Sequence, residues 1–330
     1  MKTKWRIFFG AIVVVLLIYA ISKINFPEVY QIARGIKPKF FLFAFVSCSL
    51  SIIIFSLRGM ISLRKVVPHH DFWFFLETTL AGFFVNSITP GLTASGEPIR
   101  AYFLGEKYSI PKTKVFGALL ADRILHGAVS LFFVIASLLF VLTYIPVSAE
   151  LKTIFQAVLF FIFLFLAIIL FLNAKKTKFN FKVLLKKTGI LKKIKNNKKM
   201  LYIGQTFGNF ITHFKKTITD KKTLFWGMLF SFVYWILNYL SSYFLFLSLD
   251  VKVSFFLVII VVSLGSLLRE FSPSPGGAGL VEGLMIFLYA VLGVNLQAAI
   301  IVSVLSRLIL YFHSLVLGGI SIFHLEKSLG

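Results

Sequence analysis

Two short motifs place ionisable residues beside helix-breaking residues in otherwise apolar surroundings. The first reads T-P-G-x5-E over residues 89–97, and the second reads S-P-G-x5-E over residues 274–282. An arginine follows each motif on the next apolar run, Arg123 in ADRIL and Arg307 in SRLIL. Proline, glycine, glutamate and arginine therefore recur in the same order at almost one displacement, which predicts an internal repeat.

Each motif is expected to break a helix and restart it. Proline ends a helix, and glycine permits a left-handed or closely packed backbone. The restarted helix would present free N–H groups and a positive dipole end, a ready site for a phosphate or a carboxylate. The residues expected to make the breaks are Pro90, Gly91, Pro275, Gly276, Gly277 and Gly279. Pro98, directly after Glu97, is expected to kink the first segment.

The charged residues near these motifs are expected to form a paired network inside the protein. A charged side chain at the centre of a membrane helix costs roughly 2.5–3.5 kcal/mol, so unpaired charges are disfavoured. The predicted members are Glu97, Arg100, Asp122, Arg123, Arg269, Glu270, Glu282 and Arg307. In this network Arg123 and Arg307 would bind an anionic group, and the two motif glutamates would hold a cationic group or carry protons.

Two alternatives stay open for members and neighbours of this network. Arg100 and Arg269 could instead lie at the membrane interface and extend their charged ends into water. His126 and His313 follow the two repeat arginines and could join the network or face a neighbouring helix.

Composition identifies the elements that must position these residues. Mean hydropathy is +0.91, with 58% hydrophobic and 14% charged residues, which excludes a soluble globular domain. Several stretches of about 18 to 25 residues nearly lack ionisable groups, long enough to cross a bilayer as helices. We therefore predict an all-α integral membrane protein with 7–8 transmembrane helices plus re-entrant helical hairpins. The apolar runs cover about 5–21, 39–57, 72–89, 115–143, 153–172, 224–247, 254–268, 280–294 and 297–323.

The basic residues predict the sides of the membrane. Between Asn173 and Thr223 there are fifteen lysines and a single acid, Asp220, so this loop is expected on the cytoplasmic side. Its segment 203–218 reads as an amphipathic helix at the inner interface, beside anionic lipid headgroups. A second inside loop is marked by Arg58, Arg64 and Lys65. Both chain termini are also predicted to be cytoplasmic.

Three apolar runs separate the two inside loops, and three crossings cannot begin and end on the same side. The run 72–89 is therefore predicted to enter the membrane and return. The chain then forms one domain over 1–330, with repeat one at about 72–143, the loop 173–223, and repeat two at about 254–323. The second repeat would start from the outer side, so the repeats would be inverted. Inverted repeats with broken helices are typical of transporters that rock one half against the other.

Other chemistry finds little support in the sequence. No metalloprotease, serine-hydrolase, P-loop or paired-cysteine motif occurs, so we expect no catalytic residue, cofactor or metal. His69-His70-Asp71 resembles part of a metal site but fits a membrane edge better. The single cysteine, Cys48, excludes an intramolecular disulfide. Nucleic acid is not an expected partner, because the basic charge is concentrated in one loop between apolar runs.

Four segments resemble the transmembrane, flippase-like family of lysylphosphatidylglycerol synthases. They are NSITPGLTASGEPIRAYFL (86–104), ADRIL (121–125), SPSPGGAGLVEGLMIFLYAVLG (272–293) and SRLILYFHSLVLGG (306–319). The resemblance implies an inner-membrane domain that moves aminoacylated or glycosylated lipids between leaflets. In the multiple peptide resistance factors this region precedes a soluble aminoacyl-transferase domain. This sequence ends at Gly330, soon after the last apolar run, so transfer activity is not expected.

Three function classes follow. The leading hypothesis is a flippase or transporter for a phospholipid or a polyprenyl-phosphate-linked lipid in the cytoplasmic membrane, whose partners are membrane lipids. The alternative is a non-catalytic membrane partner of a separate lipid-modifying transferase, and a homo-oligomer is compatible with both. The third class, a membrane-embedded lipid transferase, needs a nucleophile or a carboxylate cluster, and the chain has only 12 acidic residues.

Overall fold

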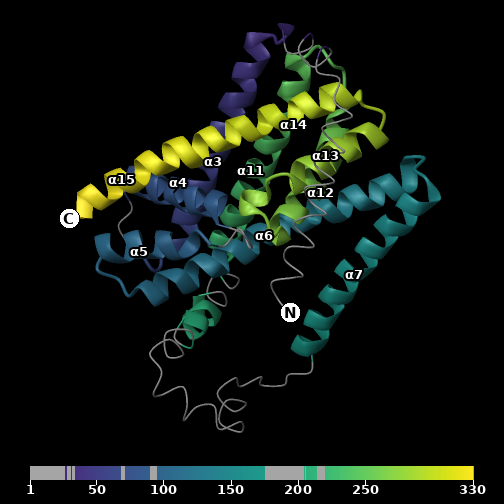
Figure 1. Cartoon of the computed structure of the whole chain (residues 1–330). Coiled ribbons are helices and arrows are strands. Elements are labelled where there is room, and N and C mark those ends of the chain that lie inside the picture. The colour runs from purple at the N-terminus through teal and green to yellow at the C-terminus, as the bar shows by residue number, and fades with distance from the viewer. Residues whose placement is uncertain are drawn as a thin grey trace, which may run out of the picture.

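The fold is entirely helical across the part of the chain that the computed structural model describes (Figure 1). These residues are 34–67, 71–89, 95–174, 206–213 and 220–329, with 27, 31 and 204 as single residues. The predicted run 5–21 lies outside them. The all-α prediction is confirmed, and each of the other eight apolar runs lies mainly within helix.

The helices have the following bounds: α3 (Pro38–Leu63), α4 (Phe72–Ile88), α5 (Glu97–Lys107), α6 (Lys112–Tyr144), α7 (Ala149–Ala174), α11 (Lys221–Ser248), α12 (Phe255–Phe271), η1 (Pro275–Gly277), α13 (Leu280–Val291), α14 (Leu296–Tyr311), η2 (Phe312–Leu317) and α15 (Gly318–Leu329). Within the described ranges, four helical spans are long and apolar enough to cross a membrane, namely 38–63, 112–144, 221–248 and 296–329. The helix α4 has 17 residues and spans only about 25 Å at 1.5 Å per residue.

The first short helix pair, α4 and α5, forms an antiparallel hairpin. At its open end the backbone N–H of Asp71 donates to the Tyr108 hydroxyl over 3.1 Å. Near its tip Gly82 and Gly96 touch, and a Cβ atom at Gly96 would lie 2.8 Å from Gly82 Cα. Only glycine allows this close approach of two backbones, so the tip of the hairpin depends on both residues.

The second short helix pair, α12 and α13, is also an antiparallel hairpin. A Cβ atom at Gly265 of α12 would lie 3.0 Å from the Met285 side chain of α13. The connection passes through η1, where Gly276, Gly277 and the following Gly279 have φ angles of 58°, 79° and 82°. L-residues with side chains rarely adopt such angles, so the glycines permit this break.

A third pair, α3 and α11, packs antiparallel along its length. The Lys37 N–H donates to Ser248 O over 2.7 Å at one end, and the Ser241 hydroxyl donates to Ala44 O over 2.8 Å further along. The buried residues of both helices are rich in serine, with Ala44, Gly59 and Gly227 in addition. Small residues of this kind bring transmembrane helices into close contact.

The same order of elements occurs twice. A long helix, a short helix, a break, a second short helix and another long helical span make up α3–α6 and again α11–α15, where the last span is 296–329. The starts of α11, α12 and α13 follow those of α3, α4 and α5 by the same 183 residues. The recurrence therefore includes α3 and α11, which the sequence repeat did not contain.

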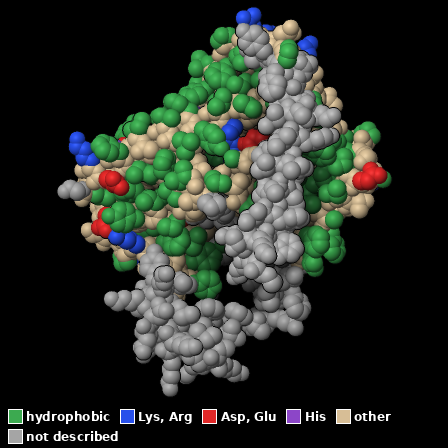
Figure 2. Space-filling model, viewed as in Figure 1, with side chains coloured by type: hydrophobic (Ala, Val, Ile, Leu, Met, Phe, Trp, Pro, Cys, Tyr) green, Lys and Arg blue, Asp and Glu red, His purple; other side chains and the backbone are tan. Residues whose placement is uncertain are grey.

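Two hydrophobic clusters hold these elements together. One joins α3, α6, α7 and α11–α14, and the other surrounds the first hairpin with the ends of α3, α6 and α15. Large apolar side chains also cover much of the outer surface, for example Phe132, Phe160 and Phe161, each at least 60% exposed. Figure 2 shows such side chains spread widely over one face of the molecule. An outer surface of this kind suits contact with lipid chains.

The last long helix is interrupted by the π-helical turn η2. At this turn the buried His313 ring bonds to Ile309 O over 2.7 Å and to the Ser49 hydroxyl over 2.8 Å. Directly after the turn, Gly318 packs on α4, where a Cβ atom would lie 2.6 Å from Leu80 O. The turn therefore lies where the last long helix packs on α4, and Figure 1 shows α14 and α15 running on as one helix there.

Candidate functional site

The first motif glutamate lies at the start of α5. Glu97 is the first residue of this helix and only 3% exposed, and its oxygens accept hydrogen bonds from Arg100 and Arg123, each over 3.0 Å. A carboxylate in the first turn of a helix also interacts favourably with the helix dipole. Pro98 lies in this first turn, where proline is tolerated, so the expected kink is replaced by a helix start.

The second motif glutamate has a matching position. Glu282 lies in the first turn of α13, where its carboxylate accepts from the Gly279 N–H over 2.7 Å and from Arg307 Nε. Arg307 also donates from Nη1 to Gly276 O over 2.9 Å. Each motif glutamate is therefore paired with the arginine of its own half, Glu97 with Arg123 and Glu282 with Arg307.

The two halves meet at the tips of their hairpins. The C-terminal end of α4 lies against η1, where a Cβ atom at Gly276 would be 3.3 Å from Ser87 Cα. Arg123 Nη2 bonds across the halves to Glu270 Oε2 over 3.4 Å. Nearby, the Asn86 side chain accepts from the Gly96 N–H over 2.7 Å and fixes the start of α5. The bonded pairs of the predicted network are thus 3 to 147 positions apart in the sequence.

Arg269 is different from the other arginines of this network. It has no hydrogen-bond or carboxylate partner among the residues that the structure describes, and its Nε atom is buried. Its side chain lies against the break, since a Cβ atom at Gly277 would be 3.4 Å from Arg269 Cγ. Four arginines (Arg100, Arg123, Arg269 and Arg307) therefore accompany three glutamates (Glu97, Glu270 and Glu282). Among the described residues, this network carries one uncompensated positive charge.

Asp122 belongs to a separate buried ion pair. Its Oδ2 atom lies 2.7 Å from Arg58 Nη2, and the two residues are 3% and 2% exposed. Arg58 also donates to the Ser231 hydroxyl over 3.4 Å and lies over the Phe55 ring. The basic residues predict a loop at Arg58, whereas Arg58 lies inside α3. The only sequence signal for it was Asp122, an acid in an apolar helix that requires a buried partner.

The alternatives left open for Arg100 and the histidines are also answered. Arg100 is 2% exposed and bonded to Glu97, so it lies in the interior rather than at an interface. His126 stacks on Trp235 at a centroid distance of 5.6 Å, and His313 bonds to Ser49 and Ile309. Neither histidine joins the arginine network.

Some predicted residues remain unplaced. Pro90 and Gly91 lie outside the described residues, as do His69 and His70 and most of the loop 173–223. Asp71 caps α4 by accepting from the Trp73 N–H over 3.0 Å. The described part of the chain contains no group of three His, Cys, Asp or Glu side chains that could hold a metal ion.

A short helical segment of the lysine-rich loop packs on α6. In residues 206–213, Asn209 donates to the Thr113 hydroxyl over 3.5 Å. A Cβ atom at Gly117 of α6 would lie 2.6 Å from Phe210 N, so the segment and α6 are in close backbone contact. This part of the expected amphipathic helix therefore has its own packing partner within the protein.

The helical fold, its apolar outer surface and its buried charge network define a polytopic helical membrane protein. A family model described as "Lysylphosphatidylglycerol synthase TM region" matches residues 7–318. The chain therefore belongs to this family, as the sequence motifs predicted.

Archaeal relatives cover most of the chain. The UPF0104 membrane protein PH1989 of Pyrococcus horikoshii is 28% identical over 299 residues, 88% of each chain. The UPF0104 membrane protein MJ1595 of Methanocaldococcus jannaschii is 28% identical over 311 residues, 93% of this chain and 90% of the relative. A UPF0104 membrane protein of Methanothermobacter thermautotrophicus is 25% identical over 316 residues, 92% of this chain and 91% of the relative.

Proposed function

We propose that this protein is a flippase that moves a lipid with an anionic phosphate between the leaflets of the cytoplasmic membrane. The observation that carries the proposal is the excess positive charge at the point where the two hairpin tips meet. Arg269 lies there without a partner among the described residues, beside Arg307 and next in sequence to Glu270. A phosphate would supply the missing negative charge, and guanidinium groups bind phosphate well.

We further propose that the two halves are inverted repeats and that each hairpin is re-entrant. The equal spacing of the corresponding helices and the antiparallel contact of α3 with α11 support an inverted relation. In each hairpin the two helices are short, and the open end of the first hairpin joins Asp71 to Tyr108. Backbone breaks at membrane depth are tolerated where they line a protein-enclosed site, and the second break, at η1, packs against the end of α4.

In this proposal Arg123 connects substrate binding to movement. Its bond to Glu97 lies within one half, and its longer bond to the 51% exposed Glu270 crosses to the other half. A lipid phosphate would compete with Glu270 for Arg123 and release the contact between the halves. Glu97 and Glu282 would hold their arginines in position, since both carboxylates are already engaged by guanidinium groups.

The predicted orientation also belongs to the proposal. The lysine-rich loop 173–223 and both termini would be cytoplasmic by the positive-inside rule. The α4–α5 hairpin would then open to the cytoplasmic side and the α12–α13 hairpin to the outer side.

Leaflet exchange in proteoliposomes tests the function. The exchange of labelled aminoacyl-phosphatidylglycerol, phosphatidylglycerol and a polyprenyl-phosphate sugar would be measured. Each lipid would be tested with the wild type and with the variants Arg269→Gln, Arg123→Ala and Arg307→Ala. We expect wild-type exchange of at least one phosphate-bearing lipid and its loss in all three variants. Arg269→Gln is the sharpest variant because it breaks no ion pair among the described residues. The matched control is Arg64→Gln, which changes an arginine outside this network.

Two results would overturn the proposal. Unchanged exchange by folded Arg269→Gln and Arg123→Ala would remove the network from the mechanism. No exchange of any tested lipid by folded wild-type protein would favour the alternative, a non-catalytic partner of a separate lipid-modifying transferase. Co-purification of a transferase would then be the next observation to seek.

A further inference from the structure

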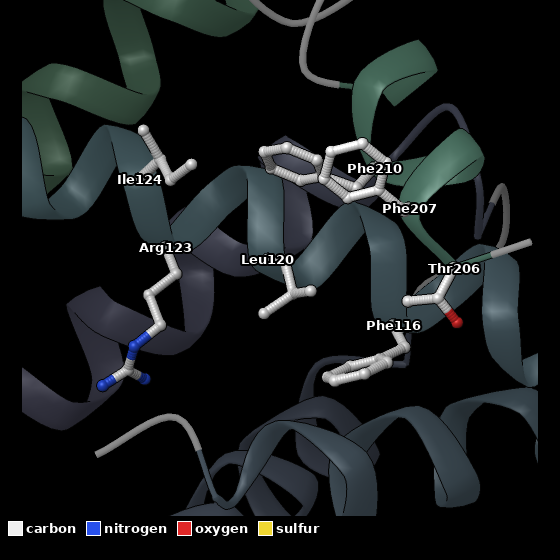
Figure 3. Close-up of a pocket in the computed structure, with 7 residues that line it drawn as sticks. All are labelled: Phe116, Leu120, Arg123, Ile124, Thr206, Phe207 and Phe210. Carbon is white, nitrogen blue, oxygen red and sulfur yellow. The ribbon is translucent and has the colours of Figure 1, made fainter. Parts of the chain in front are cut away.

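A cavity lies between α6 and the helical segment 206–213 and ends at the charge network. Its volume is about 470 Å³, within the range of roughly 300–1,000 Å³ that is usual for ligand pockets. The lining residues are Phe116, Leu120, Arg123, Ile124, Thr206, Phe207 and Phe210. Figure 3 shows that they come from two elements far apart in the sequence.

One face of α6 forms the longer wall of this cavity. Phe116, Leu120, Arg123 and Ile124 follow a spacing of four, seven and eight residues, which places them on the same side of a helix. In Figure 3 the side chains of Phe116, Leu120 and Arg123 extend to the same side of α6. The wall is therefore apolar along about two turns and then carries a single cation.

The opposite wall is held at a fixed place. Phe207 and Phe210 lie next to each other with ring centroids 6.0 Å apart (Figure 3). Their backbone is anchored to α6 by the close contact at Gly117 and by the Asn209–Thr113 bond. The cavity is thus a built feature between two packed elements rather than a gap between loops.

The lining chemistry restricts the ligand. Among the described lining residues, Thr206 is the one uncharged polar residue and is only 6% exposed, so these residues offer a polar solute few hydrogen-bond partners. A hydrocarbon chain fits an apolar wall, and an anion at its end fits Arg123. Arg123 also bonds to Glu97 and Glu270, so the ligand's charged end would enter the network described above.

We propose that this cavity holds one acyl chain of a phospholipid whose phosphate reaches Arg123. The acyl-chain site stands on the cavity alone, and its role in transport rests on the proposed function. The segment 206–213 would then act as a binding element of the lysine-rich loop, holding the chain while the headgroup engages the arginines. On the next turn of α6, a Cβ atom at Gly127 would meet no described atom within 4 Å.

Photocrosslinking tests the binding site independently of transport. The full chain would be placed in phosphatidylglycerol vesicles that contain a phosphatidylglycerol with a diazirine in one acyl chain, and the crosslinked residues mapped by mass spectrometry. We expect crosslinks on Phe116, Leu120 and the segment 206–213. Leu120→Trp fills the cavity and should reduce them about fivefold or more. The control Leu139→Trp, at a 44% exposed position of α6 outside the cavity, should not.

A second probe tests the role of the phosphate. A diacylglycerol with the same diazirine chain lacks the anion and should crosslink less at these residues. Crosslinks spread evenly over the outer faces, or the same yield at these residues from Leu120→Trp, would overturn the inference. If another segment of this chain fills the cavity, so that no lipid chain crosslinks there, the inference is also overturned.

Leaflet exchange measured on the same variants separates the two proposals. Specific crosslinks without any exchange would leave the acyl-chain site standing and overturn the flippase proposal. If folded Leu120→Trp exchanges lipid as fast as the wild type, the acyl-chain site has no role in transport. The flippase proposal then stands. Loss of both signals in Leu120→Trp, with both kept in Leu139→Trp, is the result expected from both proposals.

Discussion

Removing Asp122 is expected to destabilise the protein strongly, because it leaves Arg58 charged and buried. At a separation of 2.7 Å the two charges attract by roughly 6 kcal/mol at an effective dielectric constant of about 20. Much of this offsets the cost of taking both groups out of water, so the net value of the pair is small. Loss of one partner leaves that cost uncompensated, and we expect Asp122→Leu to reduce the free energy of unfolding by about 3–5 kcal/mol.

The assay is unfolding of the purified protein in mixed micelles, followed by tryptophan fluorescence and analysed as a double-mutant cycle. The double variant Arg58→Met/Asp122→Leu removes both charges and should recover most of the lost stability. The matched control is Glu106→Gln, which removes an exposed ion pair with Lys112 and should cost at most about 1 kcal/mol. A stable Asp122→Leu single variant, or a double variant as unstable as the single one, would refute this account of the pair.

Two further predictions concern the first hairpin and the start of α11. Gly96→Ala should prevent correct closure of the hairpin, because the added Cβ atom overlaps Gly82. Size-exclusion behaviour and thermal stability are the measurements, and the control Gly127→Ala, where a Cβ atom has open space, should leave both unchanged. A hydrogen bond from Lys65 holds the pKa of Asp220 below its usual range, so this group stabilises the fold fully above its unfolded pKa of about 3.9 and progressively less as the pH falls below it. The difference in melting temperature between wild type and Asp220→Asn should therefore be present at pH 6 and shrink towards pH 3, and a difference that does not depend on pH would contradict this reasoning.

The helices could be predicted from the sequence because apolar length is a local property. The runs 39–57 and 115–143 lie within α3 and α6, and at the second motif the helix breaks at η1 before the short helix α13 begins. The sequence also indicated that Glu97 and Arg123, and likewise Glu282 and Arg307, would be paired. Each charge needed a partner in an apolar environment, and each half offered one of opposite sign.

The sequence could not assign the remaining contacts, because they depend on which helices touch. Arg58 follows an apolar run and looks like a loop residue, yet the helix continues because Asp122 of α6 provides its partner. The bond of Arg123 to Glu270 links residues 147 positions apart, and no local spacing encodes it. Likewise Arg269 follows the apolar run 254–268 and Arg307 lies inside the run 297–323. Only the fold shows that Arg307 is paired with Glu282 and that Arg269 has no such partner among the described residues.

The antiparallel contact between α3 and α11 has a mechanical consequence. It fastens a helix of each half to its counterpart at several levels, from Lys37 with Ser248 to Arg58 with Ser231. A rigid rotation of one half against the other would have to break these contacts, whereas near the tips the described residues of the two halves are joined by the 3.4 Å ion pair of Arg123 with Glu270. Under the proposed function the α3–α11 pair would stay fixed while the two hairpins move, and the movement would be short and confined to the tips.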